Sequence, residues 1–345
     1  MKSMSMFDVN AHIHTPYSFS AFSSVGEALE HAAAEGVKVV GINDFYSMDG
    51  YGAWKEGCAA RGLYPLFGIE FISLNAEDQA TGLRVNDPSN PGRTYISGKG
   101  LAFPVILKGE PERQLKAVRA LSNAQVEKMC GKLNQWLKEQ GLPVQLDFNE
   151  IRQKLSLGSV RERHLAKALR LALYPEDENP AKLENELRGK LLKAGGPAFV
   201  PESPEAFLPM KTVQDIIEAA GGIPTYPFLA DDSKGNFTDF EGDLVKAADT
   251  LKKRGFRGVE FITTRNTTAV LEQYAGYLED EGFIVSFGSE HNTPAMEPLK
   301  LRTRDAEELS AKLKAINWRG ACAIAAHQAG LDSAAAGEDL IMQTV

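Results

Sequence analysis

The chain has 345 residues, of which 43% are hydrophobic and 24% are charged, and its formal net charge is −8. This composition is typical of a globular protein with a sizeable core, and the acidic balance argues against broad binding to nucleic acids or anionic membranes. The three cysteines lie far apart in the sequence, which argues against a disulfide framework and favours a reducing cytoplasm. We expect neither a membrane span nor a signal peptide, because no apolar run is long enough.

The first predicted strand covers residues 7–14 and ends in a His-x-His pattern. Residues i and i+2 of a strand point to the same side, so His12 and His14 can bind one metal ion without distorting the backbone. An isolated pair of this kind can equally be two unrelated histidines. The residues at the ends of the later strands indicate whether the two histidines form a metal site.

Strand and helix patterns alternate over the first 75 residues. Strands are predicted over 7–14, 37–45 and 63–71, and helices over 24–33 and 51–61. Asp44 and Glu70 fall near the ends of the second and third strands. Successive β-α units with polar groups at their strand ends predict a parallel α/β barrel, whose site lies at the carboxyl ends of the strands.

The alternation then breaks. Residues 75–105 are rich in glycine, proline, asparagine and aspartate, with a short strand-like piece at 93–97. Helical patterns follow over 112–140, 149–173 and 179–193. We interpret residues 76–205 as a mainly helical insertion or subdomain that covers one side of the barrel.

The β-α rhythm returns after residue 210. The predicted strands are 223–227, 256–262 and 283–292, and the predicted helices are 212–220, 239–254, 266–281 and 305–317. Residues 1–75 and 206–345 therefore form the predicted barrel, with about seven β-α units. Glu290 and His291 lie at the end of its last strand.

Several possible metal donors thus share one location at the strand ends. They are His12, His14, Asp44, Glu70, Glu290 and His291. Two histidines with two carboxylates suit Zn²⁺, Mn²⁺ or Fe²⁺. Each residue alone has a structural alternative, such as capping a helix, so the prediction of a metal site rests on their joint placement.

These motifs resemble the PHP (polymerase and histidinol phosphatase) family of metal-dependent phosphoesterases. The matching segments are His12-Ile13-His14-Thr15, Asn43-Asp44-Phe45, Gly68-Ile69-Glu70, Tyr226-Pro227 and Gly288-Ser289-Glu290-His291-Asn292. The resemblance covers about residues 7–75 and 210–295. It implies a distorted TIM-like barrel of seven β/α units that binds up to three metal ions.

The chain also departs from the family pattern. Phe19, Phe45 and Asn292 occupy positions where the family holds one of its metals, so the resemblance implies that this metal is absent. A second family site matches His12, His14, Glu70 and Glu290 and looks intact. His164 lies in a segment similar to the family's RPHIA sequence, as a ligand, a substrate contact or a structural helix residue. We expect one or two divalent ions.

The resemblance implies a hydrolase that acts on a small phosphorylated molecule through a metal-activated water. Asp44 or His291 would act as general acid or base. Arg265 is the first candidate to bind the phosphate, followed by Arg161, Arg163 and Lys99, although each could form an ordinary salt bridge instead. Tyr226 would orient a substrate oxygen or fill the place of a missing histidine.

Two other functions stay open at this point. Barrels with His-x-His strands also hydrolyse C–N and C–O bonds, so the substrate need not be a phosphate ester. Alternatively, the barrel has lost catalysis and serves as a binding protein, which the loss of several ligands at once would favour. Retention of both histidines, Glu70 and Glu290 argues against that second alternative, because barrel packing alone does not require these polar groups.

Overall fold

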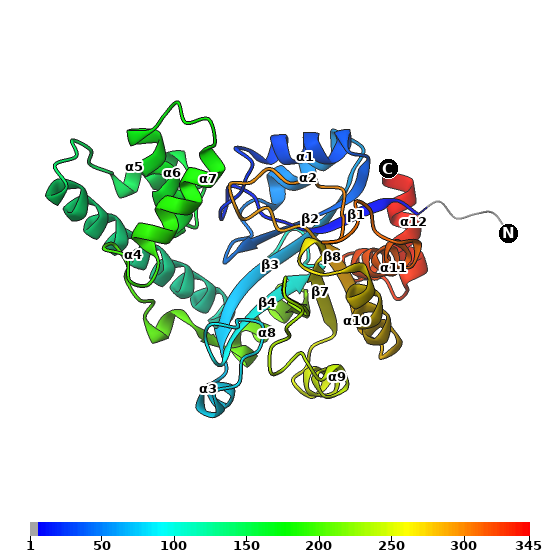
Figure 1. Ribbon diagram of the computed structural model, residues 1–345. Coiled ribbons are helices and arrows are strands. Elements are labelled where there is room, and N and C mark those ends of the chain that lie inside the picture. Colours follow the sequence, from blue (N-terminus) through cyan, green and yellow to red (C-terminus); the bar gives the residue numbers. More distant parts are fainter. Residues whose placement is uncertain (1–5) are drawn as a thin grey trace.

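The computed structural model describes residues 6–345 and has a strand barrel beside a group of helices (Figure 1). Seven strands follow one another around the barrel in the order β1-β2-β3-β4-β6-β7-β8. Their bounds are β1 (Asp8–Ile13), β2 (Val37–Phe45), β3 (Tyr64–Leu74), β4 (Arg93–Lys99), β6 (Ile223–Phe228), β7 (Gly258–Ile262) and β8 (Ile284–Gly288). The predicted fold class, a distorted α/β barrel with a large and mainly helical insertion, is confirmed.

A single bridge joins the last strand to the first. The N–H of His14 donates to the carbonyl of Glu290 at 2.8 Å, just beyond β8, and Ile13 pairs with Glu290. Close approach of the two strands is possible because residue 288 is glycine, where an added Cβ would lie 2.2 Å from the Cβ of His12. The closure therefore brings the ends of β1 and β8 together around His12.

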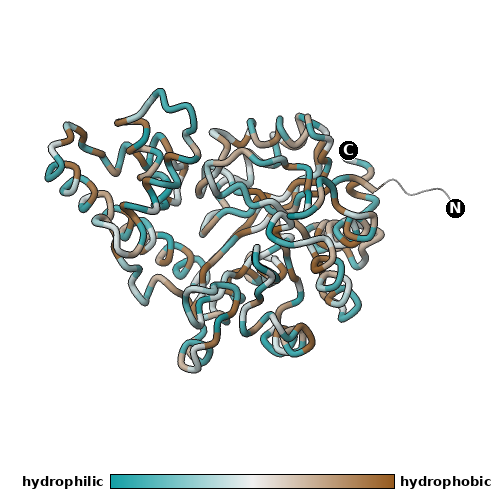
Figure 2. Tube along the Cα trace, in the orientation of Figure 1, coloured by the Kyte–Doolittle hydropathy of each residue, from teal (hydrophilic) through white to brown (hydrophobic). Residues whose placement is uncertain are grey.

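Helices cover the outside of the barrel. They are α1 (Val25–Ala34), α2 (Tyr51–Ala59), α8 (Met210–Ala219), α9 (Leu244–Lys253), α10 (Thr268–Asp280), α11 (Ala311–Gln328) and α12 (Ala334–Thr344). Local sequence explains their limits: Ser24 caps α1 by accepting from the N–H of Glu27, and Gly36 follows it with a φ of 78°. Apolar residues gather along the central strands, as Figure 2 shows. The main core thus lies between strands and helices.

The fourth strand differs from the sequence-based expectation. Residues 93–99 were assigned to the insertion, but β4 pairs antiparallel with both β3 and β6 and so belongs to the barrel. The segment between β3 and β4 carries only the short helix α3 (Ala76–Thr81), which is capped by Asn75. A short connection suits antiparallel neighbours, whereas parallel strands need a crossover. The short strand β5 (Leu208–Pro209) pairs with β3 outside this path.

The remaining helices stand to one side of the barrel (Figure 1). They are α4 (Glu110–Glu139), α5 (Phe148–Lys154), α6 (Glu162–Leu173), α7 (Pro180–Leu187) and the π-helix η1 (Arg188–Leu192), and we call them the helical lobe. The lobe has its own apolar core, which includes Met129, Leu133 and Leu169. Val118, near the start of α4, packs instead into the barrel core and links the two parts.

Two helical predictions need correction. The stretch 149–173 forms two helices rather than one, because residues 155–161 interrupt it. The last predicted helix, 305–317, begins later and runs to Gln328 as α11, followed by α12, which the sequence reading did not include. Within residues 6–345, no helix combines the length and the apolar character that crossing a membrane requires.

Candidate metal centre

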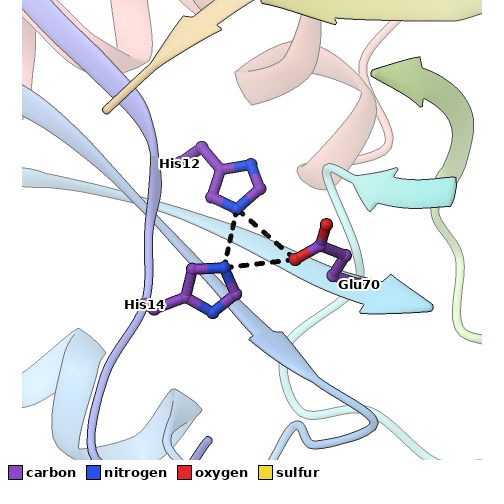
Figure 3. Close-up of side chains that lie close together, drawn as sticks. All are labelled: His12, His14 and Glu70. Carbon is purple, nitrogen blue, oxygen red and sulfur yellow. Dashed lines mark hydrogen bonds and ion pairs between the residues drawn. The ribbon is translucent and has the colours of Figure 1, made fainter. Parts of the chain in front are cut away.

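Three side chains meet at the carboxyl end of β1 and in the second half of β3, where Glu70 pairs with the last residue of β2. The Nε2 atoms of His12 and His14 lie 3.1 Å apart, and one Glu70 oxygen lies 3.1 Å from His14 Nε2 and 3.8 Å from His12 Nε2 (Figure 3). All three residues are buried, with exposed fractions of 4% or less. Sequence reasoning named all three, and the structure brings them together.

The far side of each imidazole fixes which nitrogen carries the proton. His12 Nδ1 lies 2.9 Å from a carboxylate oxygen of Glu260, which can only accept when ionised. The hydroxyl of Ser18 donates to Asp44 at 2.6 Å, so it accepts from His14 Nδ1 at 3.1 Å. Both histidines therefore carry their proton on Nδ1, and both Nε2 lone pairs point toward Glu70.

This arrangement fits a cation. Three acceptor atoms, one from each residue, lie within 4.8 Å of one another. The Glu70 oxygen that faces the histidines is buried and has no hydrogen-bond donor among the described residues. Burial lowers the pKa of His14 and raises the pKa of Glu70. A bound divalent ion would remove the lone-pair repulsion and neutralise the buried carboxylate, and two imidazoles with one carboxylate suit Zn²⁺, Mn²⁺ or Fe²⁺.

Glu260 and Lys99 support His12 from the barrel interior. Glu260, on β7, accepts from Ser97 at 3.0 Å and pairs with the Lys99 ammonium as well as with His12. Lys99, on β4, also donates to the carbonyl of Ala11 at 2.9 Å. A carboxylate behind a ligating histidine fixes the ring and raises its basicity.

Sequence reasoning missed Glu260, and it considered Lys99 only as a phosphate-binding cation. Lys99 is 3% exposed and already paired, so it is not available to a phosphate. The signal for Glu260 was a single carboxylate inside the apolar strand Val259-Glu260-Phe261. An isolated charge in a buried strand indicates a partner elsewhere in the interior.

Asp44 has the corresponding role behind His14. Its carboxylate accepts from the N–H of Thr15 at 2.8 Å, from the Thr15 hydroxyl at 2.5 Å and from Ser18. It lies 3.9 Å from His14 Nδ1 and is buried at the end of β2. Asp44 therefore orients His14 through Ser18, which differs from the expected role as general acid or base.

A cavity of about 390 Å³ opens beside the cluster. Its walls include Glu70, Phe19, Phe45, Glu290 and Asn292, together with four arginines: Arg161, Arg163, Arg188 and Arg265. Arg265 lies 2.7 Å from a Glu290 oxygen, and Asn292 bonds the other oxygen. Glu290 thus faces the cavity but is held by these partners, and the compact three-atom cluster does not include it.

Glu290 and His291 have unusual backbone conformations, with φ values of 68° and 59°. Such values are uncommon for residues other than glycine and require support from the surroundings. The Glu290 N–H donates to the carbonyl of His12 at 3.0 Å, and its carbonyl accepts from His14, as described above. The strained turn therefore holds Glu290 at the cavity wall.

The structure does not bring His291, Tyr226 or His164 to the cluster. The His291 ring nitrogens contact Ser289 Oγ and the carbonyl of Glu297, each at 2.8 Å, so the ring anchors its loop. The Tyr226 hydroxyl donates to buried Glu241 at 2.8 Å, among Phe228, Phe240 and Phe256. Both contacts are structural, and neither residue lines the cavity.

His164 lies in the first turn of α6 in the helical lobe. Its Nδ1 accepts from the N–H of Arg161 at 2.9 Å, which satisfies a backbone donor at the start of the helix. Burial lowers the pKa of His164 to about 3, so the ring is neutral. Its edge meets Phe19 at a centroid distance of 4.9 Å. Of the roles that the sequence left open, this geometry supports the structural one.

The fold and the cluster together define an α/β barrel with a buried His-His-Glu set at the carboxyl ends of its strands. Residues 10–143 match the model of the PHP domain, which confirms the family resemblance expected from the motifs. Among curated proteins, none matches the chain.

Two solved structures have a similar fold. The first is an amidohydrolase from Chromobacterium violaceum, with bound sulfate and no metal. It is 17% identical, with a TM-score of 0.61, and the match covers 88% of this chain and 93% of the amidohydrolase chain. The second is a protein from Bifidobacterium adolescentis that is proposed to be a metal-dependent phosphoesterase. It is 18% identical, with a TM-score of 0.62, and the match covers 89% of this chain and 94% of the Bifidobacterium chain. At this level of identity the similarity concerns the fold.

Proposed function

We propose that this protein is a metal-dependent hydrolase of phosphate esters with small substrates. The observation that carries the proposal is the cluster of His12, His14 and Glu70, whose buried Glu70 oxygen has no donor among the described residues, beside a cavity with arginines in its walls. The PHP match and the description of the Bifidobacterium protein support the same chemistry. Arginine suits phosphate because its planar fork of N–H donors matches the phosphate oxygens.

The chain's own residues would divide the task as follows. Glu260 and the Asp44–Ser18 pair hold His12 and His14 with their Nε2 lone pairs toward the ion. A bound divalent ion would lower the pKa of a water molecule and offset charge on a phosphoryl oxygen. Arg265, at the cavity wall, would face the phosphoryl group once it exchanges Glu290 for substrate. Phe45 stacks on His14 at a centroid distance of 5.3 Å and excludes water from one side of that ring.

Metal content and activity test this function together. Wild type, a His12→Ala/His14→Ala variant and a His31→Ala variant are purified without chelator and without an affinity tag, and metal is measured by mass spectrometry. His31 is an exposed histidine on α1 and serves as the control. We expect one to two equivalents of Zn, Mn or Fe in wild type and in His31→Ala, and none in the double variant.

Hydrolysis of phosphomonoesters and phosphodiesters is then measured on the same three proteins. Activity should follow the metal and fall at least 100-fold in the double variant. Absence of metal in reconstituted wild type would overturn the hydrolase proposal. Metal-dependent cleavage of amides or carboxylic esters alone would overturn the choice of substrate.

A further inference from the structure

Two of the arginines in the cavity wall have no acidic partner within 4 Å in the part of the chain that the structure describes. Arg188 pairs with Glu162 at 2.8 Å, and Arg265 pairs with Glu290. Arg163 donates only to the amide oxygen of Asn185, at 3.2 Å. For the Arg161 side chain, residues 6–345 provide no hydrogen bond and no ion pair within 4 Å. Two guanidinium groups therefore meet the cavity without a carboxylate bound to either of them.

Local acidic groups are already engaged. Glu162 lines the same cavity as the arginines of the lobe, and it bonds both Arg188 and Lys193, at 2.8 and 2.9 Å. Asp87, also in the wall, pairs with Arg93 at 3.2 Å. Burial and neighbouring Arg188 lower the pKa of Arg163 to about 10, which still leaves it charged at neutral pH. This part of the cavity therefore carries a net positive charge that attracts an anion.

Aromatic rings hold both guanidinium groups in place. Arg161 lies over the ring of Phe45 at 4.7 Å, and Arg163 lies near the ring of Phe19 at 5.8 Å. A ring face stabilises a cation without taking up its N–H donors. Apart from the Arg163 bond to Asn185, those donors stay free for an oxyanion, and the rings fix the direction of approach.

The stack also sets the distance to the metal cluster. Phe45 contacts both Arg161 and His14, with its centroid 4.7 Å from the guanidinium and 5.3 Å from the His14 ring. The guanidinium is therefore no more than about 10 Å from the His14 ring. A small molecule can span that distance within a cavity of about 390 Å³.

We propose that Arg161 and Arg163 bind a second oxyanion of the substrate, at the lobe side of the cavity, while the scissile phosphoester lies at the His12–His14–Glu70 cluster. The substrate class is thus a small phosphoester with an additional phosphoryl or carboxyl group a few bonds away. This inference rests on the proposed function for the position of the scissile group. The anion site itself depends only on the two arginines, so it can be tested separately.

The separate test uses inorganic phosphate as the probe and a His12→Ala/His14→Ala background, which removes two metal ligands. Phosphate binding is measured by isothermal titration calorimetry. We expect binding to persist in this background and to weaken at least tenfold when Arg161→Gln or Arg163→Gln is added. Arg152→Gln changes an exposed arginine on α5 and should have no effect. Equal binding in all four proteins would overturn the proposed anion site.

Kinetics of three matched substrates test the link to catalysis in the metal-loaded protein. They are propyl phosphate, 3-carboxypropyl phosphate and propane-1,3-diyl bisphosphate. We expect wild type to prefer one of the two doubly anionic esters at least tenfold in kcat/KM, which identifies the second group as carboxyl or phosphoryl. Arg161→Gln should reduce that preference at least tenfold, through a higher KM for the doubly anionic ester, and Arg161→Lys should restore it in part.

The outcomes separate the two proposals. Equal hydrolysis of all three esters would overturn the second-anion inference and leave the phosphoesterase proposal standing. No hydrolysis of any ester, together with arginine-dependent phosphate binding, would overturn the phosphoesterase and support the anion site. A loss of kcat/KM in Arg161→Gln by the same factor for all three esters would show that Arg161 does not bind the second anion selectively, and it would count against the inference.

Discussion

The interior of the barrel and the core of the helical lobe are both closed to solvent, yet different side chains fill them. Around His12 the barrel buries two carboxylates, an ammonium and two imidazoles. The lobe core is apolar, and the charged pair beside it, Arg170 with Glu184 at 2.8 Å, is complete in itself. Buried charge is costly unless it is fully paired, so the incomplete set in the barrel indicates a role other than stability.

The largest effect should follow from removing the carboxylate behind His12. In Glu260→Ala the buried Lys99 ammonium loses its partner, and we expect a loss of about 3–5 kcal/mol in the free energy of unfolding. Urea unfolding followed by circular dichroism measures it. The double variant Glu260→Ala/Lys99→Met should recover a large part of this loss, because it leaves no unpaired charge. A single variant as stable as wild type would show that the barrel tolerates an unpaired charge and would break the comparison.

A cavity in the lobe should have a somewhat smaller and different effect. Leu133 is fully buried in the lobe core, so Leu133→Ala should cost about 3 kcal/mol through lost contacts and the space left behind. Metal content should stay at the wild-type value, because the ligands lie in the barrel. Urea unfolding and mass spectrometry are run on one preparation. Loss of metal in this variant would show that the two interiors are not independent.

The smallest expected effect is the pH dependence of stability that the buried His164 of the lobe produces. Burial holds the pKa of His164 at about 3, far below the ordinary value of 6.5. Below pH 6.5 the unfolded chain takes up a proton that the folded chain does not, so stability falls as pH falls, by about 1.4 kcal/mol per unit.

His164→Gln keeps an acceptor for the Arg161 N–H and removes the titration. The difference in unfolding free energy between pH 7.5 and pH 5.5 should therefore shrink by about 1.4 kcal/mol in this variant. Identical pH dependence in both proteins would mean that His164 does not remain neutral in the fold. The measurement is urea unfolding at the two pH values.

Local patterns predicted much of the fold. β2 has the bounds expected from its run of buried apolar residues, Val37–Phe45. β4 was placed in the insertion because residues 93–99 lie among glycines and prolines and because antiparallel pairing with β6, more than 120 positions later, leaves no local pattern. The break at 155–161 was missed since the apolar residues continue the helical spacing on either side.

The residues of the candidate site also divide into those that a local pattern predicts and those that depend on contacts between distant positions. His12 and His14 are a local motif, and Glu70 follows from its place in a strand, so all three were predicted. Glu260 was missed because its contact with His12 joins positions 248 residues apart. The direction of Tyr226 depends on register: Pro227 pairs with inward-facing Glu260, which turns Tyr226 toward the outer core. Only the assembled barrel supplies that information.

The joining of the last strand to the first has a consequence for how the chain is made. His12, His14 and Glu70 leave the ribosome before the later barrel strands, but the bridge from Ile13 to Glu290 completes the ring only after the last of these strands has been made. Contacts between distant positions form late and slow folding. The three metal-facing atoms are thus available early, whereas Glu260, which orients His12, arrives only with the last strands. We therefore expect the His12–His14–Glu70 cluster to bind a metal ion with full affinity only after Glu260 has joined the barrel.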